Sequence, residues 1–457
     1  MKTLPEQPPE PLNILSDEDA MSWFNDSDIQ KKAADFNKKY YYWSELKYRV
    51  PDETERKRIW TCMKMYRMLR SDGVRFSNLV LQYTALPNIM RSLHAFDRHL
   101  SGSIRIQNKT IQMENSYIIN SLMDEAIASS ILEGAVTTQK VAKEMLRKKK
   151  KPRNKSEQMV LNNYETMQFI AKNIERPLTP ELICEIHQHV TKDTLEPELV
   201  GQFRTSDDIV VVDPVHGKVY HTPPKAAEIP EMIAELCKFA NHFKEPDPLQ
   251  SVAGEEETDY IHPVIRGIIL HFLIGYIHPF EDGNGRTARS LFYWYVLSQG
   301  YWLFEYMAIS RIILRSKKKY ALAYLYTEYD DMDLTYFILY NISCLNEALR
   351  DLFEYLEEKQ TEQLYTKKLI KNIKEINTRQ AKELGYLMGH SDEYFTISEI
   401  QENFSIVYQT ARTDLLHLTE LGYLNKEKRG KIFIFIFNNQ CNLWNAKLQP
   451  THNPPDI

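Results

Sequence analysis

Cysteine is scarce in this sequence, and long apolar runs are missing. The five cysteines stand far apart among 457 residues, and no two of them form a CxxC pair. Such spacing argues against a disulfide framework or a zinc site and suits a reducing compartment. No apolar run of about 18 residues occurs, so no membrane span is expected. The start of the chain lacks the basic-then-apolar pattern of a signal peptide, and we therefore expect a cytoplasmic protein.

A strong net charge is also missing. The 57 basic and 62 acidic residues leave a formal charge of -5, which provides no general reason to expect nucleic acid as a partner. Any DNA-binding part must therefore be local. Hydrophobic residues make up 43% and charged residues 26%, as in ordinary soluble globular proteins. A chain of this length exceeds a single hydrophobic core, so about two to four domains are expected.

Most of the chain has the apolar spacing of α-helices. Residues three and four apart are apolar in Glu53–Ser71, Tyr117–Ser130 and Ile261–Ile277, with few Gly or Pro inside these segments. The sequence therefore predicts a mainly α fold. The predicted parts are an N-terminal helical domain (1–110), a central domain (111–345), a helical linker (346–385) and a C-terminal domain (386–457).

One β-hairpin is predicted within the central domain. Ile209–Val212 and Lys218–His221, the second run including Val219 and Tyr220, are short β-prone runs that flank a loose turn. A lone hairpin in a helical protein has little sheet to join. It is either a loop that covers a ligand or an edge that pairs with an extended peptide, and we favour the second interpretation.

The segment His278–Arg289 combines groups that a phosphoryl-transfer site needs. Its two glycines, Gly283 and Gly285, free the backbone, so successive N–H groups can point into one concavity. The helix expected from Arg286 onward adds its positive N-terminal end, which favours anions. Arg286 and Arg289 lie one helical turn apart, so both guanidinium groups can reach the same anion.

Two further residues of this segment have matching chemistry. Asp282 offers a hard oxygen ligand for Mg²⁺, which keeps most of its waters and binds phosphate oxygens. His278 has the pKa range of a general base. A lone Gly-Asn-Gly is usually a turn, and a lone histidine at a helix end is usually structural. Because several distinct chemical requirements are met in a fixed order, the turn-only interpretation is the weaker one.

The segment matches H-x-F-x-[D/E]-G-N-G-R-x-x-R, the signature of the Fic family, at every defined position. The chain resembles this family over residues 115–345. His262–Arg266 and His271 resemble the helix before the family's loop, and Gly201–Arg204 with the hairpin is similar to its flap. The resemblance implies a multi-helix Fic core with a β-hairpin flap.

The same resemblance implies a protein adenylyltransferase that moves AMP from ATP onto a Tyr, Thr or Ser hydroxyl of a target protein. His278 would be the base, Asp282 would hold Mg²⁺, and Arg286 would stabilise the leaving pyrophosphate. The side chain of Asn284 would orient phosphate, and Phe280 would pack the loop into the core. The Gly-Asn-Gly-Arg pattern is intact, which favours AMP over other transferred groups. The implied ATP-binding residues are Asp282, Gly283, Asn284, Gly285, Arg286, Thr287, Ala288, Arg289 and Tyr320.

A second motif stands upstream, at the end of a helix expected over residues 117–134. Ser129 and Glu133 are four residues apart and share one face, and Gly134 stands where a left-handed C-cap belongs. Most glutamates in such a place are solvated surface residues. Next to an intact active motif, this one resembles the Fic inhibitory motif [S/T]-x-x-x-E-[G/N]. The resemblance implies autoinhibition, with Glu133 paired to Arg289 and repelling the triphosphate.

The C-terminal block resembles a winged helix-turn-helix. Phe395–Ile400 begins a capped helix, a second helix follows, and a strand pair turns at Arg429–Gly430. The second helix would face a DNA major groove. A protein-interaction or dimerisation module is the alternative, because a fold does not determine a function. The residues expected to contact DNA are Gln409, Thr410, Arg412 and Thr413 for the groove, and Lys426, Lys428, Arg429 and Lys431 for phosphates.

Three functions are compatible with these patterns. The leading one is autoinhibited AMP transfer, with ATP and a target protein as partners and Mg²⁺ as cofactor. The second is a DNA-binding regulator whose Fic domain senses a nucleotide, and the intact motif speaks against it. The third uses the same site in reverse, with Glu133 activating water to remove AMP. The sequence leaves a homodimer open and gives no reason to expect a membrane partner.

Overall fold

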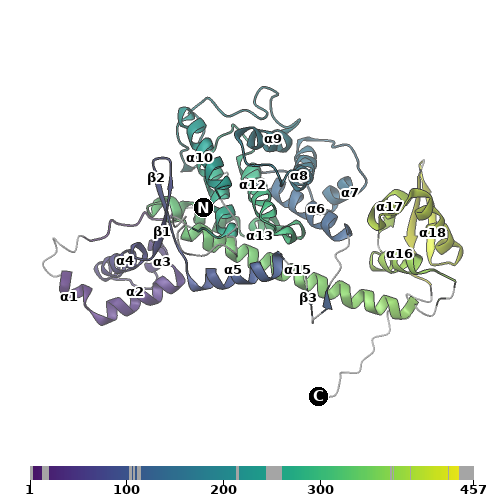
Figure 1. Cartoon of the computed structure of the whole chain (residues 1–457), viewed down its shortest axis with the longest axis horizontal. Helices are drawn as coiled ribbons and strands as arrows, with labels where there is room; N and C mark the ends of the chain where they lie inside the picture. Colours follow the sequence, from purple (N-terminus) through teal and green to yellow (C-terminus); the bar gives the residue numbers. More distant parts are fainter. Residues whose placement is uncertain are drawn as a thin grey trace, which may run out of the picture. The chain divides into compact units, whose positions relative to one another are not determined.

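The computed structural model is mainly α-helical, which confirms the predicted fold class (Figure 1). The chain divides into two compact units, one made of residues 1–104 and 121–349 and the other of residues 105–120 and 350–457. Within the part of the chain that is described, no helix is both long and apolar enough to cross a membrane. The described residues are 4–12, 20–101, 105–106, 109–110, 115–212, 216–242, 260–370, 373, 375–391, 393–430 and 432–441.

The first part of the larger unit contains five helices and a β-hairpin among its described residues. They are α1 (Ala20–Phe24), α2 (Ser27–Lys39), α3 (Trp43–Leu46), α4 (Glu53–Met68), β1 (Ser71–Phe76), β2 (Leu79–Thr84) and α5 (Pro87–Leu100). The sequence predicts a helix through Ser71, but α4 ends at Met68 and Ser71 begins β1. Val74 and Phe76 are buried and alternate with exposed neighbours, which is the period of a strand. The sequence did not predict this hairpin, because the helical spacing of the preceding residues outweighs the short alternation of buried and exposed residues in β1.

Aromatic residues form the core of this first part. Tyr40, Tyr42 and Trp43 are at most 4% exposed. The ring of Tyr42 stacks on Tyr326 with centroids 3.8 Å apart, although the two residues are distant in sequence. This contact joins the N-terminal helices to a helix of the central region.

A buried polar network makes the same connection. The Arg67 guanidinium donates to the Tyr336 hydroxyl at 2.5 Å and to the Tyr41 carbonyl at 2.8 Å. It lies 3.5 Å from the Asp330 carboxylate, which also pairs with Lys64 at 2.7 Å. Since a buried charge is stable only when its partners surround it, this network fixes how the two regions meet.

The centre of the larger unit is a helical core in which α11 packs along α12. All residues of α11 from Pro263 to Ile274 are buried, as expected for a helix that is apolar on every side. Gly267 allows the close approach, because a Cβ there would lie 3.1 Å from Val296. The elements are α6 (Asn115–Leu132), α7 (Gln139–Arg147), α8 (Lys155–Lys172), α9 (Pro180–Thr191), β5 (Val211–Val212), β6 (Val219–His221), η1 (Ala226–Glu228), α10 (Ile229–Asn241), α11 (Pro263–Ile277), α12 (Asn284–Ser298), η2 (Trp302–Tyr306), α13 (Ile309–Arg315), α14 (Lys317–Tyr329) and α15 (Thr335–Ile370).

The predicted hairpin is confirmed in this region, since the strands β5 and β6 pair antiparallel. The Thr179 hydroxyl accepts from the Leu182 N–H and caps α9. Residues 213–215 of the expected turn lie outside the described residues.

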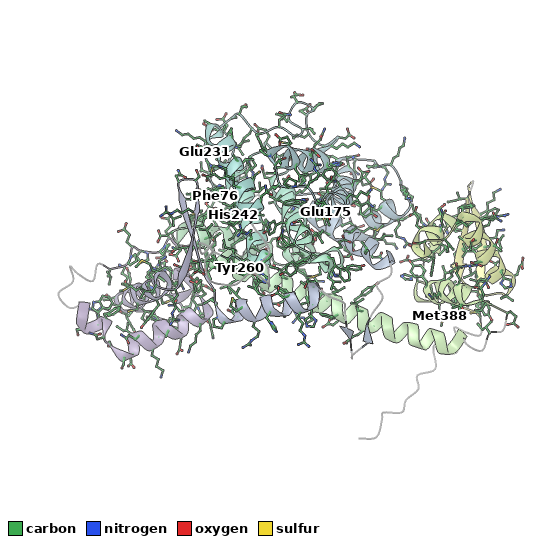
Figure 2. All side chains as sticks on the ribbon, viewed as in Figure 1. Phe76, Glu175, Glu231, His242, Tyr260 and Met388 are labelled. Atoms are coloured by element: carbon green, nitrogen blue, oxygen red, sulfur yellow. The ribbon has the colours of Figure 1, made fainter. Side chains whose placement is uncertain are left out.

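The smaller unit contains a three-stranded antiparallel sheet in the order β7-β9-β8. Thr396 caps α17 and forms a capping box with Glu399, as predicted for this helix start. Helix α16 spans the predicted boundary at residue 385 between the linker and the C-terminal domain. Its Leu384 and Met388 both belong to the core of this unit (Figure 2 labels Met388). The elements are β3 (Arg105–Ile106), β4 (Lys109–Thr110), α16 (Thr378–Gly389), β7 (Tyr394–Phe395), α17 (Ile397–Phe404), α18 (Tyr408–Glu420), β8 (Leu424–Arg429) and β9 (Ile432–Phe437).

We predict that Arg67→Met lowers the free energy of unfolding by about 3 kcal/mol, because it removes one member of a buried charged network. Denaturant unfolding followed by circular dichroism measures the change. The control is Lys38→Met, since the Lys38–Asp35 pair is exposed on both sides. Equal unfolding midpoints for the two variants would contradict a stabilising role for the network.

Candidate functional site

His278 stands at the junction between α11 and the loop that follows it. It adopts a left-handed backbone conformation with φ 48°, which turns the chain out of the helix. Its Nδ1 lies 3.3 Å from the Gly275 carbonyl. Because a carbonyl only accepts, Nδ1 carries the hydrogen and Nε2 carries the lone pair. Burial lowers the pKa of His278 to about 4, so the imidazole is neutral at physiological pH.

The side chain of Asn284 stabilises the loop through two hydrogen bonds to the backbone of Phe280. Its Oδ1 accepts from the Phe280 N–H at 2.9 Å, and its Nδ2 donates to the Phe280 carbonyl at 2.7 Å. The family resemblance implies that this side chain orients phosphate. In the structure both ends of its amide bind the Phe280 backbone and hold the loop.

The N-terminus of α12 is the anion-attracting part of the site. Gly283 is its N-cap with φ 85°, and the helix begins at Asn284, two residues before the expected start. A Cβ built on Gly285 would collide with Oε1 of Glu133. The carboxylate of Glu133 therefore lies directly against the first turn of α12, where an anion is favoured by the helix dipole and the unpaired N–H groups.

The structure brings Ser129, Glu133 and Arg289 together. Arg289 Nε donates to the Ser129 hydroxyl at 3.0 Å, and its NH2 group donates to the Ser129 carbonyl at 3.1 Å. The same NH2 group lies 2.9 Å from Glu133 Oε1. Arg289 is only 4% exposed, whereas the Glu133 side chain is 30% exposed. The ion pair thus joins a buried guanidinium to a carboxylate that solvent can reach, through a charge-assisted hydrogen bond.

Arg286 lies in the first turn of α12 and contacts α9. Its NH1 group donates to the Val190 carbonyl of α9 at 2.7 Å, and its NH2 group is 3.6 Å from Asp282 Oδ2. Its side chain is 1% exposed, and this burial lowers its pKa. Thr287 and Ala288 point into the core and are at most 1% exposed. Their side chains therefore pack in the core behind α12, and only their backbone can face the loop.

The carboxylate of Asp282 suits a site that shares a magnesium ion with a ligand. Its side chain is half exposed, and its Oδ1 accepts from the Gly283 N–H at 2.6 Å. Among the described residues, no group of three His, Cys, Asp or Glu side chains is arranged to hold a metal by itself. One carboxylate fits Mg²⁺ when phosphate oxygens and waters complete the coordination.

Tyr320 lies beside α11. Its hydroxyl is 2.8 Å from Nε2 of His271, and its ring is 6.2 Å from that of Phe337. Burial lowers the pKa of His271 to about 3, so this histidine is neutral. The Tyr320 hydroxyl is therefore engaged with a buried imidazole on the side of α12 where Arg289 lies.

The flap is anchored to the core at its end. His221 Nδ1 lies 2.7 Å from Glu328 Oε2, and its Nε2 lies 2.7 Å from the Tyr276 carbonyl. Tyr276 is two residues before His278, so this anchor holds the flap next to the loop. Val219 is 47% exposed and Tyr220 is half-buried, which leaves the strand β6 partly open toward solvent.

Two residues of this site carried no role in the sequence analysis. Arg204 donates through Nε to the His278 carbonyl at 2.9 Å and through its NH2 group to the Pro224 carbonyl. His187 of α9 contacts the Asp282 carbonyl at 2.9 Å and stacks on the Phe280 ring at 3.7 Å. Arg204 stands in the segment that resembles the flap, whereas His187 has no sequence pattern that distinguishes it from a core histidine.

Residues 177–296, which run from α9 through the flap and loop into α12, match the model of the Fic/DOC family. The chain carries a Fic/DOC domain. The curated relatives include "Protein adenylyltransferase Fic" of Aedes aegypti, 31% identical over 127 residues, and the protein of the same name of Nematostella vectensis, 28% identical over 135 residues. These matches cover 27% and 29% of this chain but only 20% and 26% of the relatives.

A solved structure of a Fic family protein from Desulfovibrio desulfuricans G20 aligns with 79% of this chain and 98% of its own at 16% identity, with a TM-score of 0.49. The family match covers His278, Asp282, Arg286 and Arg289. Glu133 lies upstream of the matched segment.

Outside the Fic domain, the smaller unit presents polar and basic side chains. Gln409, Arg412 and Thr413 are exposed on α18, and Thr410 is half-buried. Lys426, Lys428 and Arg429 are exposed along β8, an edge strand of the sheet. Lys431 lies outside the described residues.

The buried histidines predict a pH dependence of stability. The pKa of His278 falls from 6.5 to about 4 on folding because of burial. Between these values the unfolded chain binds a proton that the folded chain does not, so stability falls as pH drops from 6.5 toward 4. We expect His278→Gln to make this fall shallower, which urea unfolding at pH 7, 5.5 and 4.5 measures. An unchanged slope would mean that His278 is not held neutral.

Proposed function

We propose that this protein transfers AMP from ATP to a hydroxyl group of a protein target and that its own Glu133 inhibits the reaction. One observation carries the proposal: the carboxylate of Glu133, the residue after α6, occupies the anion position at the N-terminus of α12, near a neutral imidazole and two buried arginines. A site that attracts a carboxylate there would attract a phosphate more strongly.

In the proposed reaction, Nε2 of His278 accepts the proton of the target hydroxyl. The hydroxyl oxygen forms a bond to the α-phosphorus, and the bond from that phosphorus to the oxygen bridging to the β-phosphate breaks. Pyrophosphate leaves, and AMP remains on the target. The α12 N–H groups and Arg286 would stabilise the negative charge that develops, since they are already oriented before the reaction.

Asp282 is the residue we propose to hold Mg²⁺, which would neutralise phosphate charge when bound. Its partial exposure and its contact with Gly283 support this role. Arg289 would bind the far end of the triphosphate. Arg289 could bind phosphate only after the Glu133 side chain moves away, because its NH2 group now faces the Glu133 carboxylate and would have to face phosphate instead.

The flap is proposed to align the target. Strand β6 has the exposed side chain of Val219 and belongs to a two-stranded hairpin that no third described strand pairs with. An extended target segment could add to this edge and place its hydroxyl near His278. The anchor between His221 and the Tyr276 carbonyl would keep that edge in a constant position.

We predict that Glu133→Gly raises AMP transfer from α-labelled ATP by about 5- to 150-fold, the usual range of a coupling between two sites. Adding His278→Ala should lower the rate by about 10²- to 10⁴-fold, the usual contribution of a general base. Label incorporation, with mass spectrometry for the AMP adduct, measures both effects. The control is Asp124→Asn, because this carboxylate lies on the same helix but pairs with Lys143.

The outcomes separate the alternatives. Labelling that survives His278→Ala would contradict the proposed chemistry. An unchanged rate in Glu133→Gly would contradict the proposed inhibition alone and would leave the proposed transfer reaction standing. If wild-type protein removes AMP from a labelled target and Glu133→Gly does not, the site works as a hydrolase in which Glu133 activates water.

The surface of the smaller unit favours a second activity, DNA binding by a winged helix-turn-helix. The order α16, β7, α17, α18, β8, β9 contains two helices in succession followed by a strand pair. The exposed polar face of α18 would meet base edges, and the lysines of β8 would meet phosphates.

For this activity we predict that Lys426→Gln with Lys428→Gln weakens binding to duplex DNA and reduces the slope of log affinity against log salt by about 2, one unit for each lost phosphate contact. Fluorescence anisotropy at several salt concentrations measures both quantities. Lys38→Gln, in the other unit, is the control. Absence of DNA binding at low salt would exclude this activity.

A further inference from the structure

The last turn of α9 forms a floor beneath the catalytic loop. His187 contacts the Asp282 carbonyl, and the Val190 carbonyl accepts from Arg286. A Cβ on Gly283 would lie 2.7 Å from Cγ2 of Thr191, so the loop backbone rests on this turn with no space between them. One helix turn therefore touches the proposed metal ligand, the N-cap of α12 and one phosphate-binding arginine.

His187 makes the most specific of these contacts. Its Nδ1 accepts from the Gly201 N–H at 3.0 Å, so Nδ1 has no hydrogen. Its Nε2 must then carry the hydrogen and donate to the Asp282 carbonyl at 2.9 Å. The ring lies parallel to Phe280, with an interplanar angle of 3°. Both nitrogens and one ring face are thus used, and His187 is fully buried.

The peptide between Asp282 and Gly283 is the part of the loop that this histidine controls. Gly283 has a positive φ, a conformation open to glycine but without a preference for one orientation of the preceding peptide. The hydrogen bond from His187 selects one orientation. That orientation directs the Asp282 carbonyl toward α9 and the Gly283 N–H away from it. The Asp282 carboxylate lies on the N–H side, because its Oδ1 accepts from that N–H.

We propose that His187 is a positioning residue of the transfer reaction: it aligns the Asp282–Gly283 peptide so that the Asp282 carboxylate and the N-terminus of α12 face the nucleotide together. This inference rests on the proposed function. It predicts that a variant without the hydrogen bond to Asp282 loses more of its kcat than a variant without the aromatic ring.

The test uses substitutions at His187 in the active Glu133→Gly background. His187→Phe keeps a ring that can stack on Phe280 but loses both hydrogen bonds. His187→Gln keeps a donor for the Asp282 carbonyl and loses the stacking ring. His189→Phe is the matched control, because His189 lies two residues along the same helix and faces the ring of Phe169 at 4.3 Å.

We expect His187→Phe to lower kcat by about 10²-fold, the usual effect of a displacement of about 1 Å in a reacting site. His187→Gln should recover to within about tenfold of the parent, and His189→Phe should match the parent. Binding supplies a readout besides activity. Calorimetry should show that His187→Phe reduces the gain in ATP affinity that Mg²⁺ provides, while affinity for metal-free ATP changes little.

Two results would overturn the proposal. The first is a kcat for His187→Phe equal to that of His189→Phe. The second is an equal loss for the Phe and Gln variants accompanied by equal drops in Tm, because that pattern describes a core histidine. If the parent variant transfers no AMP but Mg²⁺-dependent ATP binding still depends on His187, the proposed function fails and the positioning role stands.

Discussion

The unpaired N–H groups at the start of α12 are the constraint on which the site depends. A helix leaves its first N–H groups without partners, and here they lie beneath a loop and next to buried arginines, where little water reaches them. Such an end needs an anion nearby. In this structure the carboxylate of Glu133 lies there, and its pairing with Arg289 satisfies the arginine at the same time. The same features that would favour a triphosphate thus favour the carboxylate of Glu133.

The loop is held in place before any ligand arrives, and from three directions. Asn284 closes it from within, Arg204 holds the His278 carbonyl from the flap side, and His187 holds the Asp282 carbonyl from below. Each contact fixes a backbone group and leaves the reacting side chains free. Because these restraints act on the backbone, the energy for ordering the loop is supplied by folding and need not be supplied by nucleotide binding.

Sequence patterns predicted the helical fold, the hairpin of β5 and β6, and the approach of Glu133 to Arg289, which are 156 residues apart. These features depend on local spacing or on a motif with a fixed arrangement. The contacts of His187 and Arg67 could not be predicted in this way. Each joins helices that are distant in the chain, and a single buried histidine or arginine has no periodicity that tells which partner it will meet. The hairpin at Ser71 was missed because its six-residue strands are too short to override the helical pattern beside them.

Release of Glu133 does not require α6 to leave its place. Glu125 anchors helix α6 to the core, because its buried carboxylate accepts from the Ser310 N–H at 2.8 Å and from the Tyr293 hydroxyl at 2.9 Å. Glu133 follows the last helical residue, and Gly134 after it has φ 93°, so the glutamate stands where the chain turns out of the helix. Its side chain is also the more exposed partner of the ion pair. A rotation of that side chain toward solvent would free Arg289 from the ion pair while the helix stays anchored, so the proposed inhibition would be reversible without loss of a core contact.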